Sequence, residues 1–307
     1  MRVRLPSGAM PVLMTGAMLA GAALARYGNA AAARREKIAH GELRELDAMW
    51  TWVDDVCWHA RFSTPPGKRD SPTIVLIHGF GASSRYLVPF AERLAVLGDV
   101  YAPDLPGHGK TDARDTPLDI AGYADALAAW LDAMELSRVQ AIGHSMGSQI
   151  AVELALRRPD LVERLVLIGP TIDRSSRNLR GTLPRFITGG FREPLGVGLL
   201  LLIDYLRSRR ALSAELRSMF RYALEDAIRR VEVPVLLVRG EHDKVAPAAW
   251  LEHLARNAPN ARVASVPGAA HAVQFSDPDA LVRAVRPFLA RQQAPVRDVA
   301  SSASRTA

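Results

Sequence analysis

The chain has 307 residues, of which 49% are hydrophobic and 23% are charged, a composition typical of a globular protein with a sizeable core. The formal net charge is +7, but the basic residues are dispersed and few aromatic residues lie among them, so nucleic-acid binding is a poor interpretation. The single cysteine, Cys57, excludes an internal disulfide and a cysteine-based metal cluster. Its strand-like surroundings favour a buried, inert thiol over a nucleophile.

The first 26 residues have the pattern of a targeting segment. Met1 to Arg4 carries two arginines, and Ala9 to Ala25 is uncharged and rich in Ala, Met, Leu and Gly, with Ala23-Leu24-Ala25 resembling a cleavage site. We interpret residues 1–26 as a candidate signal peptide or membrane anchor, so that export or membrane contact is as well supported as a cytoplasmic location. The alternatives are an Ala-rich helix on the main domain and a wrongly chosen start codon.

Strand-like and helical patterns alternate from residue 50 to residue 289. The predicted strands are 50–53, 56–62, 73–77, 100–102, 138–142, 165–168, 233–238 and 261–266. The predicted helices are 85–97, 120–134, 148–157, 247–254 and 278–289, the last with Asp277 as its N-cap. This alternation predicts an α/β fold with a mostly parallel, twisted sheet and helices on both faces.

One segment interrupts the alternation. Residues 171–230, which we call the cap segment, are rich in arginine and contain no convincing parallel strand, but they include a very apolar helix at 195–206. We therefore expect a helical insertion after the sixth strand, with the α/β core formed by residues 50–170 and 231–290. Residues 291–307 are low in apolar residues and are predicted to be disordered.

The sequence Gly143-His144-Ser145-Met146-Gly147 joins a predicted strand to a predicted helix. A Gly-x-Ser-x-Gly motif in this setting forms a sharp turn that exposes the serine, and small neighbours let strand and helix pass each other. The helix N-terminus also offers free N–H groups and a positive dipole end, which suit an oxyanion. His78, Asp243 and His271 also follow strands directly, so we expect them at the same sheet edge.

From Trp50 to Leu289 the chain resembles a serine hydrolase of the α/β-hydrolase fold. The resemblance rests on five motifs in family order, which are His78-Gly79-Phe80-Gly81, Asp104-Leu105-Pro106-Gly107-His108-Gly109, Gly143-His144-Ser145-Met146-Gly147, Gly240-Glu241-His242-Asp243 and Gly268-Ala269-Ala270-His271. It implies that the cap segment covers the site. It also implies a catalytic triad of a nucleophile, a general base and an orienting acid, which are Ser145, His271 and Asp243.

The resemblance implies an oxyanion hole made by the backbone N–H groups of Phe80 and Met146. Asp173 is a competing acid, because some members carry the acid after the preceding strand. Asp243 fits better, since an Asp-x-x-x-Pro pattern after a strand is matched from Asp243 to Pro247. His78, His144 and Asp104 are expected to hold the loops near the site.

The expected activity is hydrolysis of a small-molecule ester, with an apolar acyl chain, through an acyl-enzyme. A lipid or thioester substrate, carbon–carbon bond hydrolysis, cofactor-free haloperoxidase chemistry and a non-catalytic binding role remain open alternatives. The helix at 195–206 either lines an acyl pocket or packs the cap segment onto the core. We expect no cofactor or metal, because nucleotide-binding loops are absent from the sequence and its histidines lack zinc-ligand spacing. The oligomeric state is not predicted.

Overall fold

The computed structural model describes residues 32–63, 71–190, 193–208 and 212–290. The predictions for residues 1–26 and 291–307 lie outside these ranges. The chain divides into two compact units, Met1–Glu45 and Leu46–Ala307. In the described part of the first unit, a helix covers residues 32–39 and Arg34 pairs with Glu45 at 3.2 Å. Among the described helices, none has both the length and the apolar character needed to cross a bilayer.

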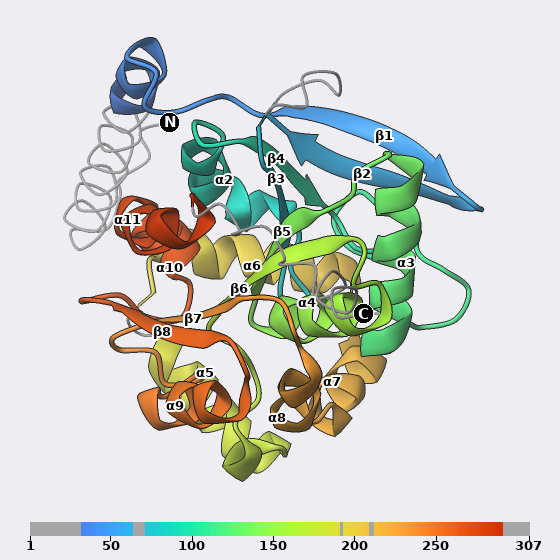
Figure 1. Cartoon of the computed structure of the whole chain (residues 1–307), viewed down its shortest axis with the longest axis vertical. Coiled ribbons are helices and arrows are strands. Elements are labelled where there is room, and N and C mark those ends of the chain that lie inside the picture. Colours follow the sequence, from blue (N-terminus) through green and yellow to red (C-terminus); the bar gives the residue numbers. More distant parts are fainter. Residues whose placement is uncertain (1–31, 64–70, 191–192, 209–211, 291–307) are drawn as a thin grey trace, which may run out of the picture. The chain divides into compact units, whose positions relative to one another are not determined.

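The described residues of the second unit form a single sheet of eight strands in the order β1-β2-β4-β3-β5-β6-β7-β8 (Figure 1). The strands are β1 Asp47–Val53, β2 Val56–Phe62, β3 Thr73–Ile77, β4 Asp99–Pro103, β5 Val139–His144, β6 Val162–Ile168, β7 Val235–Gly240 and β8 Ala261–Val266. The antiparallel pairings are β1 with β2 and β2 with β4, and the pairings from β4 through β8 are parallel. The predicted α/β fold is therefore confirmed.

Helices cover both faces of the sheet, because the central strands are apolar on both sides. In β3, Val75 and Ile77 pack on one face, and Ile74 and Leu76 pack on the other. The first face carries α3 Ile120–Ala133, α4 Met146–Arg157 and α9 Ala248–Asn257. The second carries α2 Val88–Leu94, α10 Val273–Ser276 and α11 Pro278–Leu289. Each fully buried side chain of this kind contributes roughly 1.5–3 kcal/mol of hydrophobic stabilisation.

The helices predicted at 85–97 and 148–157 begin differently in the structure, and the cap predicted for the last helix is confirmed. The helix expected at 85–97 is a short 3-10 turn, Ser84–Leu87, followed by α2, which begins at Val88 and has Pro89 in its first turn. Proline lacks an N–H group and is tolerated at the start of a helix, so Pro89 begins the second element. The helix expected from Ser148 begins two residues earlier, at Met146. Asp277 caps α11 as predicted, since its carboxylate accepts a hydrogen bond from Ala280 N.

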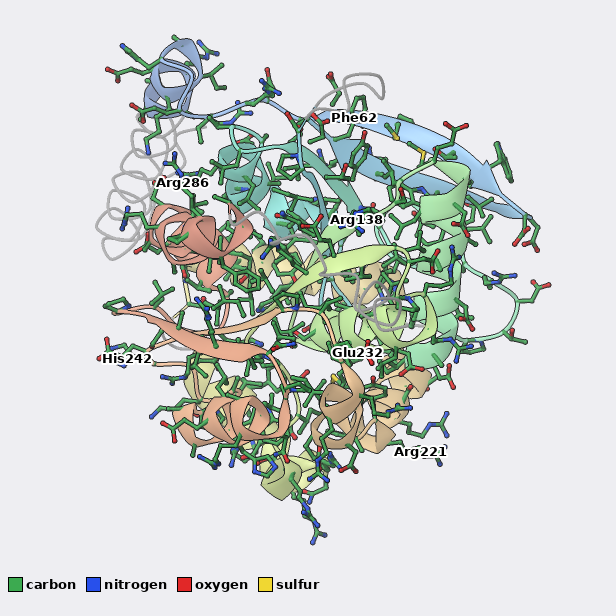
Figure 2. All side chains as sticks on the ribbon, viewed as in Figure 1. Phe62, Arg138, Arg221, Glu232, His242 and Arg286 are labelled. Carbon is green, nitrogen blue, oxygen red and sulfur yellow. The ribbon has the colours of Figure 1, made fainter. Side chains whose placement is uncertain are left out.

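The described residues of the cap segment form helices and 3-10 turns and contain no strand. The helices are α5 Leu179–Gly190, α6 Leu195–Ser208, α7 Leu212–Arg221 and α8 Leu224–Ala227. The apolar helix predicted at 195–206 is α6. Not all of its leucines are buried, since Leu202 and Leu206 are exposed to solvent. Basic side chains lie on separate elements, as Figure 2 shows for Arg138 before β5, Arg221 at the end of α7 and Arg286 in α11.

Two buried carboxylates join the cap segment to the loops at the carboxyl edge of the sheet. Asp204 of α6 accepts a hydrogen bond from Ser83 Oγ at 2.6 Å. Glu215 of α7 forms an ion pair with His108, with 3.0 Å between Oε1 and Nε2, and both side chains are fully buried. Burial disfavours both charges, but their mutual attraction raises the pKa of His108 and lowers that of Glu215. The pair therefore lies buried in its charged form.

Replacing Glu215 with Gln should lower the free energy of unfolding by about 3 kcal/mol, because His108 loses its buried counter-charge. The pKa of Glu215 is lowered from 4.5 and that of His108 is raised from 6.5, so the pair is fully charged between these two values. The difference between wild type and variant should shrink as the pH falls through the folded-state pKa of Glu215 or rises through that of His108. Urea unfolding at several pH values measures this, with the exposed Glu252→Gln as control. A pH-independent difference would argue against a charged pair.

Candidate active site

Ser145 lies in a left-handed backbone conformation between β5 and α4, with φ 56° and ψ −118°. A Cβ atom on Gly143 would lie 2.2 Å from the carbonyl oxygen of Gly147, and one on Gly147 would lie 2.3 Å from that of Ile77. Larger residues at either position would therefore collide with backbone. Ser145 N donates to Ile168 O at 2.9 Å, which fixes the turn to β6. The predicted strand–turn–helix setting of the serine is confirmed.

A cavity of about 340 Å³ lies over Ser145 and His271. The core contributes polar and aromatic groups to its floor, among them Phe80 and His144. The cap segment contributes mainly apolar residues, which are Phe186, Pro194, Val197, Leu199, Leu201 and Tyr205. The helix α6 thus lines the cavity with Leu199 and Leu201, whereas Leu202 and Leu206 of the same helix are exposed. This volume is in the range of small-molecule sites.

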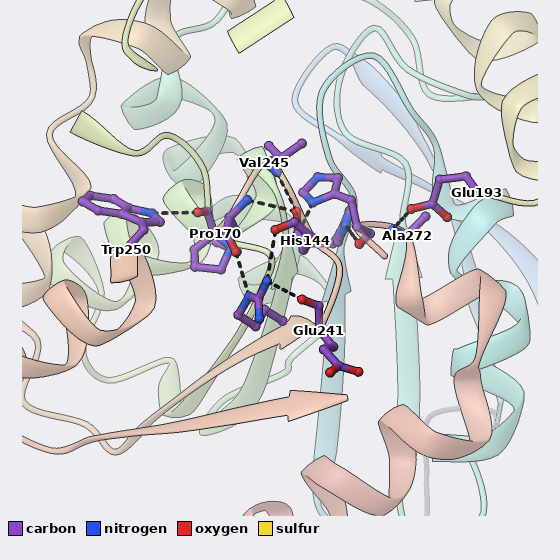
Figure 3. A network of polar contacts seen from close by, with 12 residues as sticks. His144, Pro170, Glu193, Glu241, Val245, Trp250 and Ala272 are labelled. Carbon is purple, nitrogen blue, oxygen red and sulfur yellow. Dashed lines mark hydrogen bonds and ion pairs between the residues drawn. The ribbon is translucent and has the colours of Figure 1, made fainter. Parts of the chain in front are cut away.

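Asp243 and His271 are joined by a hydrogen bond of 2.9 Å between Oδ2 and Nδ1. The other carboxylate oxygen of Asp243 accepts from Val245 N at 2.8 Å and from Ala246 N at 2.9 Å. Arg239 donates to the carbonyl oxygen of Asp243 at 3.1 Å, so the loop after β7 is held at several points (Figure 3). The carboxylate is therefore fixed in one orientation before any ligand is bound.

The charges of this pair support each other. Burial alone would lower the pKa of His271, but the carboxylate of Asp243 and its hydrogen bond raise it above 6.5. Burial alone would raise the pKa of Asp243, but His271 and two backbone N–H groups lower it. The remaining ring nitrogen of His271, Nε2, is buried, and no hydrogen-bond partner for it lies among the described residues. The ring therefore has one nitrogen oriented by a carboxylate and one nitrogen that faces no hydrogen-bonding group of the described residues.

The competing acid, Asp173, lies elsewhere. Its Oδ2 pairs with Arg185 of α5 at 2.9 Å. The Nδ1 atom of His271 is bonded to Asp243, so the structure brings Asp243, and not Asp173, to this histidine.

A chain of hydrogen bonds connects three loops around the cavity through Tyr86 and His144. Gly79 N donates to the Tyr86 hydroxyl at 2.8 Å, the hydroxyl bonds His144 Nδ1 at 2.8 Å, and His144 Nε2 bonds the carbonyl oxygen of His271 at 3.0 Å. A carbonyl oxygen only accepts, so Nε2 carries the proton and Nδ1 accepts from Tyr86. Burial lowers the pKa of His144 to about 3, which is consistent with this neutral form.

His78 and Asp104 hold the neighbouring loops, as expected from the sequence. His78 Nε2 accepts from Leu105 N at 3.0 Å, and its Nδ1 donates to Gly79 O at 3.0 Å. Burial, with the nearby His108, lowers the pKa of His78 to about 4. Asp104 accepts from Ser84 N at 2.6 Å and from Lys110 N at 3.0 Å.

Cys57 is free and only half-buried, so it is more exposed than predicted.

Residues 74–284 match the model of the alpha/beta hydrolase family. The chain belongs to this family. It is 32% identical over 247 residues, 70% of its length, to a pimeloyl-[acyl-carrier protein] methyl ester esterase of Neisseria meningitidis serogroup B (strain MC58), of which 92% is covered. It is 28% identical over 253 residues, 72% of its length, to a 2-(acetamidomethylene)succinate hydrolase of Mesorhizobium japonicum, of which 89% is covered. A solved structure, described as a membrane phospholipase A and a bacterial virulence factor, matches with TM-score 0.64 and 25% identity over 92% of this chain and 97% of its own.

Membership of the alpha/beta hydrolase family accounts for the fold and the order of the motifs, but the polar contacts of Tyr86 and Glu193 at the cavity were not predicted from the sequence. Tyr86 was included only in a helix, although a tyrosine in a buried apolar segment needs a partner for its hydroxyl. Glu193, between α5 and α6, lines the cavity and accepts a hydrogen bond from Ala272 N. No motif marks it, because its contact depends on how the cap segment packs.

Replacing Tyr86 with Phe should lower the free energy of unfolding by about 1–3 kcal/mol, because Gly79 N–H and His144 Nδ1 lose their buried partner. Thermal or urea unfolding measures the change. Tyr222→Phe is a matched control, since it removes a single hydrogen bond of 3.0 Å to Glu153 in a half-buried setting. An effect of Tyr86→Phe no larger than that of Tyr222→Phe would contradict the chain of hydrogen bonds through Tyr86 and His144.

Proposed function

We propose that this alpha/beta hydrolase cleaves carboxylic esters through an acyl-enzyme on Ser145. The observation that carries the proposal is the state of His271. Its Nδ1 is bonded to the buried Asp243, its Nε2 has no hydrogen-bond partner among the described residues, and the ring lines the same cavity as Ser145. A serine hydroxyl needs a base at neutral pH, and an imidazole oriented by a carboxylate is the base that serine hydrolases use.

In the first step, Ser145 Oγ attacks the ester carbonyl carbon while His271 Nε2 takes the hydroxyl proton. The carbonyl oxygen becomes an oxyanion, for which we propose the N–H groups of Phe80 and Met146 as donors. Met146 is the first residue of α4, so its N–H group has no partner within the helix. The dipole of α4 favours the same negative charge.

Collapse of the tetrahedral intermediate breaks the bond to the alcohol oxygen, which receives the proton from His271. The acyl group is then an ester of Ser145. A water molecule gives its proton to His271 and attacks the acyl carbon, and the second collapse returns the proton to Ser145 and releases the acid. Asp243 stays ionised throughout and stabilises the imidazolium that forms in both steps.

The cavity favours an ester with an apolar acyl chain. Val197, Leu199 and Leu201 of α6 line it, and Leu199 is also 62% exposed, so it lies where the cavity meets the surface. Four other exposed apolar residues lie on α5 and α6, which are Leu183, Ile187, Leu202 and Leu206. The names of the relatives, a methyl ester esterase and a phospholipase, agree with ester chemistry. Membrane contact through residues 1–26 stays a prediction, since they lie outside the described part.

Replacing Ser145 with Ala should lower the hydrolysis of short p-nitrophenyl esters by about 10⁴-fold or more. Covalent labelling by a fluorophosphonate should disappear with it, because the reagent reacts with an activated serine. Ser213→Ala, at an exposed position of α7, is the control and should keep both properties. Undiminished labelling of the Ser145→Ala variant would sink the mechanism.

Replacing Asp243 with Asn should lower kcat by roughly 10³–10⁴-fold. In the wild type, kcat/KM should fall with decreasing pH as His271 gains its proton. The midpoint of this acidic limb of the pH profile should lie above pH 6.5, because Asp243 raises the pKa of His271. Without the negative charge the limb should move to lower pH, because burial then dominates the pKa of His271. Asp173→Asn is the control and should keep both rate and pH profile. If Asp173→Asn lost activity and Asp243→Asn kept it, Asp173 would be the acid.

A further inference from the structure

Glu193 places a carboxylate among the mainly apolar residues that the cap segment contributes to the cavity. It lies between α5 and α6, and its Oε1 accepts a hydrogen bond of 2.7 Å from Ala272 N (Figure 3). Its other oxygen, Oε2, is buried and has no hydrogen-bond partner among the described residues. Both Glu193 and Ala272 line the cavity. A carboxylate is thus tied by one oxygen next to His271, and its second oxygen has no hydrogen bond within the part of the chain that the structure describes.

An unpartnered buried carboxylate oxygen is unfavourable unless something binds it. A buried charged acceptor that is left unsatisfied costs the full desolvation penalty of that group. Burial raises the pKa of Glu193, which reflects the same loss of hydration. A cationic group in the cavity would offset this loss further, beside His271, whose charge already lowers the pKa of Glu193.

The position of Glu193 indicates which half of an ester it meets. His271 must protonate the leaving alcohol oxygen, so the alcohol half of the substrate has to lie next to His271. Glu193 is bonded to Ala272, the residue that follows His271, and its charge is near enough to raise the pKa of His271, so we place it beside the alcohol half. Aromatic rings also line this cavity, those of Phe186 and Tyr205, and the Phe186 ring lies 5.9 Å from that of His271. A cavity that holds both a carboxylate and aromatic rings suits a quaternary ammonium group.

We propose that Glu193 forms a subsite for a cationic alcohol half, of the substituted-ammonium class, in the ester that Ser145 attacks. This subsite rests on the proposed esterase function. It would make this hydrolase select substrates by the charge of the leaving alcohol, while the apolar residues of α6 accept the acyl chain.

The test compares two butyrate esters of nearly equal shape that differ in charge, butyrylcholine and 3,3-dimethylbutyl butyrate. Wild-type kcat/KM should be higher for the choline ester by about fivefold or more, which corresponds to about 1 kcal/mol. Glu193→Gln keeps an oxygen that can accept from Ala272 N but removes the charge, so the ratio of the two kcat/KM values should fall to about one. The ratio cancels any loss of folded protein or of general activity.

Glu241→Gln is the matched control. Glu241 Oε2 also accepts a backbone hydrogen bond from the loop that carries His271, at 2.8 Å from Gly268 N, but Glu241 is not among the residues that line this cavity. It should keep the wild-type ratio. If both variants changed the ratio equally, Glu193 would act only by holding the loop, and the subsite would be rejected.

The remaining outcomes separate the subsite from the esterase function. A wild-type ratio near one, or a ratio that survives Glu193→Gln, overturns the subsite while hydrolysis of both esters upholds the esterase function. Hydrolysis of neither ester by a protein that a fluorophosphonate still labels also overturns the subsite. Hydrolysis of neither ester together with no labelling overturns the proposed function and, with it, the subsite.

Discussion

The left-handed backbone at Ser145 is the constraint on which the rest of the site depends. It persists because β5 and α4 pass within contact distance at glycines, where a Cβ on Gly143 would lie 2.2 Å from Gly147 O. A strained residue of this kind is retained only when its surroundings determine it fully. Here the sheet supplies them, since Ser145 N bonds Ile168 O and the neighbouring strands are buried on both faces. Packing of the core is thus the source of the geometry at the surface of the cavity.

Around that turn, neutral and charged histidines have different tasks. Burial keeps His78 and His144 neutral, so they act as fixed hydrogen-bonding links between loops. Asp243 raises the pKa of His271, so this ring favours a proton, which fits the role of base that we propose for it. His108 pairs with Glu215 and ties α7 to the core. Histidine is therefore a neutral link at His78 and His144, where burial dominates, and it favours a proton at His108 and His271, where a carboxylate is paired with it.

Patterns that depend on neighbouring residues were readable from the sequence, and contacts between distant segments were not. The apolar run of β3 predicts a strand buried on both faces, and the motifs after β5, β7 and β8 place Ser145, Asp243 and His271 at one edge. Tyr86 and His144 are 58 positions apart, and Glu193 and Ala272 are 79 apart. Which partners these side chains find is decided by tertiary packing, which no local periodicity records.

Trapping the acyl-enzyme tests the central role of Ser145 most directly. A p-nitrophenyl butyrate reaction would be quenched with acid within milliseconds, digested with trypsin and analysed by mass spectrometry. The peptide of residues 139–157, which lies between Arg138 and Arg157, should gain the mass of one butyryl group on Ser145, and the gain should vanish at long reaction times. Release of nitrophenol by folded protein with no acyl group on this peptide, at any time, would contradict the mechanism.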